Sequence, residues 1–139
     1  SQINYSLAHS SVETFGDNTL VCMDTKEFRW YKKHDFPVMA FSPQAKGFFA
    51  KLAKGDAANN LPEGQYAGPA NLARLAKVKQ LSEQTGDTPA KITLGYLNSQ
   101  PFFVSSVFAV TKLWQLDEDM EAQDLTYDPK TVAFLENMI

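Results

Sequence analysis

One short loop combines the residue types that hold phosphate groups in proteins. Ser42 offers a hydroxyl, Lys46 a cation, and Gly47 a backbone that a ligand can approach closely. The loop follows the apolar run 38–41, which is typical of a strand buried on both faces. Serine–proline turns are common in proteins. The loop is therefore a candidate phosphate site because of its place directly after a strand.

The elements that position this loop follow from the hydrophobic pattern. Residues 2–7, 38–41 and 102–110 are expected to form strands. Helices are expected at residues 24–34, 72–81, 88–97 and 113–123, and from residue 128 onward. Residues 8–23 are expected to form a loop, and residues 42–70 a long loop or a partly helical insertion. Strands that alternate with helices predict right-handed crossovers and a parallel sheet.

Local signals support the expected helices. Asp24 with Glu27 three residues later forms a capping-box pattern, and Thr88 is the expected N-cap of the helix that Pro89 opens. In the acidic helix 113–123, Leu116 and Met120 are expected to face the core.

Size and charge limit the classes of function. The 139 residues, 44% of them hydrophobic, suffice for one core, so residues 1–139 are expected to form a single domain. A net charge of −3 and a pI near 5.3 argue against a nucleic-acid partner. Lys32, Lys33 and His34 form only a small basic cluster, which a solvated helix end explains.

The single cysteine and the hydropathy pattern predict a cytoplasmic protein. Cys22 has no second cysteine for an intrachain disulfide, which fits a reducing compartment. Its apolar neighbours favour a small buried hydrophobe over a reactive thiol. No apolar run approaches the roughly 20 residues of a membrane-spanning helix, and the signal-peptide pattern is missing, so no membrane partner is expected.

The order of these segments resembles the C-terminal half of the aldo-keto reductases, which are nicotinamide-dependent (β/α)8-barrel enzymes. The likeness rests on residues 36–47, the helices 72–81 and 88–97, and residues 111–119, and it covers about residues 1–135. It implies an α/β partial TIM barrel, in which the last three strands and their helices form a parallel sheet. In such barrels, function collects beyond the carboxyl ends of the strands.

The resemblance implies NADP or NAD as cofactor and a small carbonyl compound as the substrate of the full enzyme. Ten residues would then hold the dinucleotide: Gln2, Phe41, Ser42, Lys46, Gly47, Thr111, Lys112, Gln115, Glu118 and Asp119. In the family, a glutamine at the position of Gln2 bonds the nicotinamide carboxamide, and an aromatic ring at the position of Phe41 stacks on the nicotinamide. Taken without the resemblance, Gln2 is an exposed polar residue and Phe41 a core residue.

The segment after the third strand departs from the family pattern at two positions. The family often has arginine where Gln115 stands, and that arginine helps to bind the ribose 2′-phosphate. Since glutamine carries no charge, the choice between NADP, which the family favours, and NAD stays open. The family usually has asparagine where Asp119 stands, and Asp119 would still accept a bond from the adenine amine. Glu118 and Asp119 are equally explained as a solvated acidic helix face.

No catalytic residue is expected in this chain. In the family, the catalytic tyrosine, lysine, aspartate and histidine lie on the first four barrel strands, and nothing here matches those segments. The five tyrosines have no neighbours arranged to lower a phenol pKa, and His9 and His34 are isolated. Metal-ligand spacing, a P-loop and a glycine-rich dinucleotide fingerprint are absent from the sequence. The chain alone is therefore expected to be inactive.

Three strands with their helices leave both sheet edges and an apolar face uncovered. We therefore expect self-association, docking on a missing N-terminal half, or strand exchange. A chain that starts on a strand is also expected to be a fragment. Two alternatives remain: a non-enzymatic half-barrel that serves as an interaction or assembly module, and an unrelated α/β domain.

Overall fold

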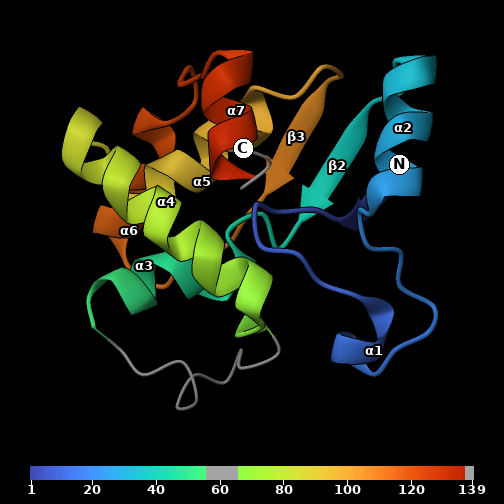
Figure 1. Cartoon of the computed structure of the whole chain (residues 1–139), viewed down its shortest axis with the longest axis horizontal. Helices are drawn as coiled ribbons and strands as arrows, with labels where there is room; N and C mark the ends of the chain where they lie inside the picture. Colours follow the sequence, from blue (N-terminus) through green and yellow to red (C-terminus); the bar gives the residue numbers. More distant parts are fainter. Residues whose placement is uncertain (56–65, 137–139) are drawn as a thin grey trace.

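The computed structural model, which describes residues 1–55 and 66–136, contains a parallel three-stranded sheet in the order β1-β2-β3 (Figure 1). The strands are β1 Gln2–Asn4, β2 Val38–Phe41 and β3 Val104–Val107. Both neighbouring pairs are parallel. The predicted α/β class with three parallel strands is therefore confirmed, although the outer two strands are shorter than predicted.

Eight helical segments are described around this sheet. They are α1 Val12–Phe15, α2 Thr25–His34, the 3-10 turn η1 Ala45–Gly47, α3 Phe48–Ala53, α4 Pro69–Thr85, α5 Pro89–Asn98, α6 Leu113–Glu121 and α7 Pro129–Leu135. In Figure 1, α2 lies on one flank of the strands, and α4, α5 and α7 lie on the other. The expectation of a long loop or a partly helical insertion covers residues 42–70. It falls on η1, on α3 and on residues 56–65, which lie outside the described residues.

The predicted caps explain where two of these helices begin. The Asp24 carboxylate accepts a bond from the Glu27 backbone N–H at 2.8 Å and so caps α2. The Thr88 hydroxyl accepts one from the Lys91 backbone N–H and caps α5, whose first residue is proline. Helix α4 ends at Gly86, whose φ of 81° is the left-handed conformation that glycine adopts without a steric cost.

The two faces of the sheet differ sharply in exposure. Along β2, Val38 and Ala40 are buried, whereas Met39 between them is 48% exposed. Successive strand side chains point to opposite faces, so one face is covered and the other is open. The strand register places Gln2, Met39 and Ser105 in one row of the open face. This matches the expected half-barrel, whose inner face remains uncovered.

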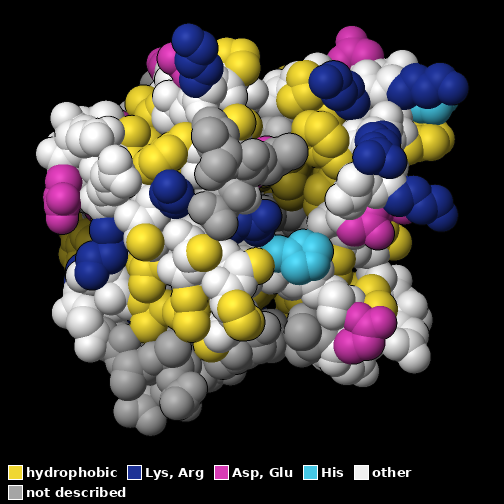
Figure 2. Space-filling model, viewed as in Figure 1, with side chains coloured by type: hydrophobic (Ala, Val, Ile, Leu, Met, Phe, Trp, Pro, Cys, Tyr) yellow, Lys and Arg dark blue, Asp and Glu magenta, His cyan; other side chains and the backbone are white. Residues whose placement is uncertain are grey.

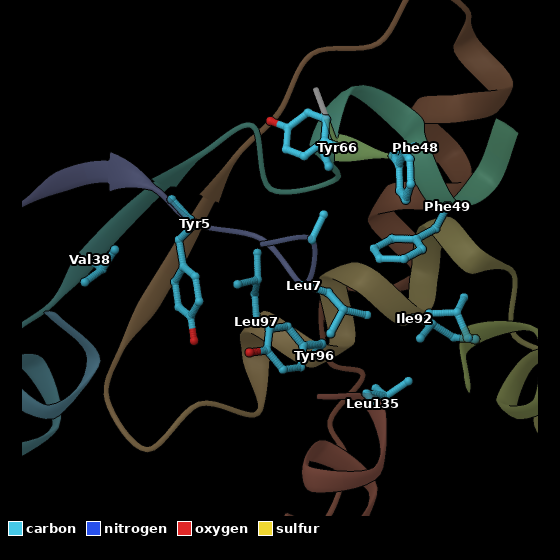
Figure 3. Packing of buried hydrophobic residues seen from close by; sticks show 14 of the residues in the cluster. Tyr5, Leu7, Val38, Phe48, Phe49, Tyr66, Ile92, Tyr96, Leu97 and Leu135 are labelled. Atoms are coloured by element: carbon cyan, nitrogen blue, oxygen red, sulfur yellow. The ribbon is translucent and has the colours of Figure 1, made fainter. Parts of the chain in front are cut away.

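The core lies between the covered face and the helices. Figure 3 shows Tyr5 and Leu7, from the segment after β1, beside the α5 side chains Tyr96 and Leu97. Phe48 from the start of α3 is also buried in this cluster. Every residue of α5 from Ile92 to Leu97 is buried, so this helix lies at the centre of the packing.

Helix α6 does not bury the face that the sequence predicts. Leu116 and Met120 were expected to be inward, but they are 39% and 49% exposed. The buried residues are Asp119, which bonds to Gln44, and the C-cap residue Ala122, whose carbonyl accepts a bond from Asn98 of α5.

The segment 8–23 contains more structure than the predicted loop. Besides α1, Cys22 forms an isolated parallel bridge with Asn4. The Asn4 N–H donates to the Val21 carbonyl, and the Met23 N–H donates to the Asn4 carbonyl, both at 2.8 Å. This bridge covers part of the outer edge of β1. Within residues 1–55 and 66–136, no strand pairs with the outer edge of β3.

None of the helices in the described residues is both long enough and apolar enough to span a membrane. In Figure 2, basic side chains gather over α2 at the upper right. They belong to the solvated face of this helix, where Lys32 and Lys33 are exposed. The prediction of a solvated basic helix end is therefore confirmed.

Candidate functional site

The loop that follows β2 has an unusual backbone. Ser42, Ala45, Lys46 and Gly47 all have φ between 49° and 80°, and only the last is glycine. Two turns close the loop: the Ala45 N–H donates to the Ser42 carbonyl and the Gly47 N–H to the Gln44 carbonyl, each at 2.9 Å. Non-glycine residues in this region cost free energy, and such strain tends to collect at functional sites.

This loop forms one wall of a cleft of about 880 Å³. The cleft lies beyond the carboxyl ends of β2 and β3, where α/β sheets bind their ligands. Seven of the ten predicted residues line it: Ser42, Lys46, Gly47, Thr111, Gln115, Glu118 and Asp119. Segments separated by about 70 residues of sequence thus meet in one place. Lys112 is the exposed N-cap residue of α6 and adjoins this wall.

Gln115 caps the first turn of α6. Its side-chain carbonyl accepts bonds from the backbone N–H groups of Thr111 and Lys112 at 3.0 and 3.1 Å, and from the Thr111 hydroxyl at 3.2 Å. These bonds satisfy N–H groups that the helix itself leaves unpaired. The uncharged Gln115 side chain is therefore fixed by its role in the cap.

Asp119 connects α6 to the loop that follows β2. Its Oδ1 accepts a hydrogen bond of 2.7 Å from the Gln44 side-chain nitrogen. The residue is only 4% exposed. Burial raises the pKa of the Asp119 carboxyl, the Gln44 bond opposes this rise, and the nearby Glu118 adds to it. The alternative that Asp119 belongs to a solvated acidic helix face is thus wrong, whereas Glu118 lines the cleft and is partly exposed.

The lining of the cleft also contains residues that the sequence analysis missed. Lys51, Lys54 and Lys79, from α3, its C-terminal end and α4, line the cleft together with Trp114 of α6. The Lys54 ammonium lies 5.3 Å from the centre of the Trp114 ring, within the range of a cation–π contact. The three-residue spacing of Lys51 and Lys54 was the available signal, but it fell within a segment interpreted as loop.

Gln2 and Phe41 lie outside this cleft, on the open face of the sheet. Phe41 is the last residue of β2 and directly precedes the cleft-lining Ser42. Gln2 pairs with Met39, so it lies on the same face as Phe41 and about 7 Å nearer the amino end of the sheet. The open face and the cleft are therefore continuous at the end of β2.

This arrangement suits an extended anionic ligand with a flat ring. The cleft offers lysine cations for phosphate groups, the Trp114 ring is half-exposed, and the neighbouring face offers the Phe41 ring and the Gln2 amide. Acid–base catalysis has no comparable support in the described residues. Burial raises the pKa of both the Tyr5 and the Tyr96 phenols, which makes them weaker acids. No described group of three or more His, Cys, Asp or Glu side chains could hold a metal ion.

Comparison with known proteins places this geometry in a family. The model of the aldo/keto reductase family matches residues 19–139. Among solved structures, a thermostable aldo-keto reductase in complex with the inhibitor epalrestat is similar, with a TM-score of 0.61 and 13% identity. An aldo/keto reductase from Klebsiella pneumoniae in complex with NADP and acetate has a TM-score of 0.61 and 19% identity. One from the same organism in complex with NADPH has a TM-score of 0.59 and 17% identity.

These likenesses cover 99% of this chain but only 38–39% of each of the three solved chains. At such low identity they establish the shared fold and leave the ligand of this chain to be argued from its own residues.

Proposed function

This chain belongs to the aldo/keto reductase family, and we propose that it is the cofactor-binding part of an NADP(H)- or NAD(H)-dependent reductase of aldehydes or ketones. A bound nicotinamide dinucleotide supplies the hydride for carbonyl reduction. The residues of this chain would bind and orient that cofactor. The tyrosine, lysine, aspartate and histidine that the family uses for proton transfer have no counterparts here, so we expect the chain alone to be inactive.

The observation that carries the proposal is the convergence of seven of the ten predicted residues on one cleft. Ser42, Lys46 and Gly47 would hold the pyrophosphate through a hydroxyl, a cation and backbone N–H groups. Thr111 and Lys112, at the N-terminal end of α6, would meet the adenosine phosphates, where the helix dipole favours negative charge.

The nicotinamide would lie on the open face of the sheet. There the Phe41 ring would stack on it and the Gln2 side chain would bond its carboxamide. The choice between NADP and NAD depends on what meets the 2′-phosphate. Since Gln115 is uncharged and bound in the helix cap, another lysine of the cleft lining, such as Lys54 or Lys79, would have to supply the charge.

A fluorescence titration with NADPH tests this proposal. Trp114 lines the cleft, so bound NADPH should quench its emission. Trp30, which stacks on His34 of α2, is the other fluorophore, and Trp114→Phe should abolish most of the signal. We expect weak binding, with a dissociation constant well above the micromolar range, because the chain offers only part of a barrel mouth.

Two results would contradict the proposal. Quenching that persists in Trp114→Phe would place the ligand elsewhere, and a lack of binding to NADPH and NADH alike would refute the cofactor role. Turnover of an aldehyde by the pure chain would show that a proton donor does lie within it.

The second candidate function, a non-enzymatic interaction module, is favoured by the uncovered apolar surfaces. Met39 and Val107 are exposed on the open sheet face, and Leu113, Leu116 and Met120 form an exposed stripe along α6. We expect the chain to self-associate through these surfaces, and Leu116→Lys to weaken the association. Light scattering after size-exclusion chromatography measures this, and a dilute monomer with a cooperative melt would argue against it.

A further inference from the structure

We propose that Asp119 is a positioning residue of the cleft, which holds the left-handed loop 42–47 in place through Gln44. The resemblance implied a different role, a direct bond to the adenine amine. The consequence for ligand affinity rests on the proposed cofactor function, whereas the tether itself is a property of the chain without ligand.

The exposure of Asp119 argues against direct ligand contact. Its carboxylate belongs to a residue that is 4% exposed, although it borders the cleft. Glu118, one residue earlier on α6, also lines the cleft and is more exposed. A ligand amine that entered the cleft would therefore reach Glu118 first.

The hydrogen bond to Gln44 has the features of a strong tether. It joins side chains 75 residues apart, its length is 2.7 Å, and it is partly buried. Its acceptor is a carboxylate, and hydrogen bonds to charged groups contribute more than neutral ones, especially where water is excluded.

The loop needs such a tether because its backbone is strained. Ser42, Ala45 and Lys46 are non-glycine residues with φ near 50°. Strained conformations persist only where the surroundings hold them. Gln44 lies between Ser42 and Ala45, so its bond to α6 ties the middle of this strained segment to the helix.

Hydrogen exchange of individual amides, followed by NMR without ligand, tests the tether. The reporters are the Ala45 and Gly47 N–H groups, which close the two turns of the loop. Removal of either partner, by Asp119→Ala or Gln44→Leu, should speed their exchange about tenfold or more. The double variant should add little, because both changes break the same bond. Asp119→Asn keeps an acceptor for Gln44, so its exchange should stay within about threefold of the parent chain.

Two controls separate the tether from general damage. Glu118→Ala removes the neighbouring charge without touching the bond and should leave both reporters unchanged. Amides in the core of α5 should exchange as in the parent chain. Unchanged reporters in Asp119→Ala, fully additive effects in the double variant, or equal acceleration within α5 would each overturn the inference.

A ligand pair then distinguishes positioning from direct contact. NADPH and its hypoxanthine analogue, which lacks the adenine amine, are titrated against the parent chain, Asp119→Ala and Gln44→Leu. A tether predicts that both variants weaken both ligands by the same factor. A selective loss of NADPH in Asp119→Ala alone would overturn the inference. If the parent chain binds neither dinucleotide, the proposed cofactor function fails, and the exchange experiment still decides the tether.

Discussion

Helix α5 precedes β3 in the sequence and α6 follows it, but α5 buries mainly apolar side chains whereas α6 buries an acidic one. In α5, six consecutive residues from Ile92 to Leu97 are buried. In α6, Asp119 is buried, while Leu113, Leu116 and Met120 are exposed. Other elements of the same chain thus bury α5. Helix α6 has an acidic contact with the cleft on one side and an apolar stripe without a partner among the described residues on the other.

The difference shows that burial depends on the neighbours available and less on the hydrophobic pattern of the helix itself. α5 contacts β3, α3, α4 and α6, which surround it. α6 contacts α5 mainly through one face. The apolar stripe of α6 is therefore exposed to solvent in the described part of the chain.

The largest predicted effect separates the two helices directly. Leu97→Ala removes a fully buried side chain from α5 and should lower the free energy of unfolding by about 3 kcal/mol. Leu113→Ala, at a residue that is 81% exposed, should change it by less than about 0.5 kcal/mol. Denaturant titration measures both. A loss at Leu113 comparable to that at Leu97 would mean that the α6 stripe is covered in solution, and would contradict the comparison.

The same contrast explains how far the sequence analysis reached. The caps at Asp24 and Thr88 were predictable because short-range chemistry determines them. The parallel sheet was predictable from the alternation of strands and helices along the chain. The face that α6 buries was not, because its apolar spacing fits a core helix and only its neighbours decide the outcome. The lysine wall was missed for a similar reason: Lys54 and Lys79 become neighbours of the cleft only through the packing of α3 and α4.

The bridge at Cys22 belongs to the same class of omissions. Its segment carries turn-forming residues, so the local pattern indicated a loop, whereas the unpaired edge of β1 provides the hydrogen-bonding partners that give it structure. Long-range pairing of this kind leaves little trace in a single sequence.

The smallest predicted effect concerns the buried acid of α6. Burial raises the pKa of Asp119 above its ordinary value of 3.8. Because the folded pKa lies above the unfolded one, the stabilisation from this group is full below the unfolded pKa and is lost as the pH rises through the folded pKa. The side-chain amide in the Asp119→Asn variant does not titrate. The stability of this variant relative to the parent chain should therefore improve as the pH rises above about 4.

Asp128 provides a matched carboxylate with the opposite sign. It caps α7, and bonds from the Thr131 backbone lower its pKa. Its stabilisation is present above the unfolded pKa and is lost as the pH falls. The free energy of unfolding of Asp128→Asn should therefore lie furthest below that of the parent chain near neutral pH. Urea titrations of both variants between about pH 3.5 and pH 7 measure the two slopes. Slopes of the same sign would mean that Asp119 is solvated like the exposed Asp128. This result would contradict the comparison between α5, which buries apolar side chains, and α6, which buries an acidic one.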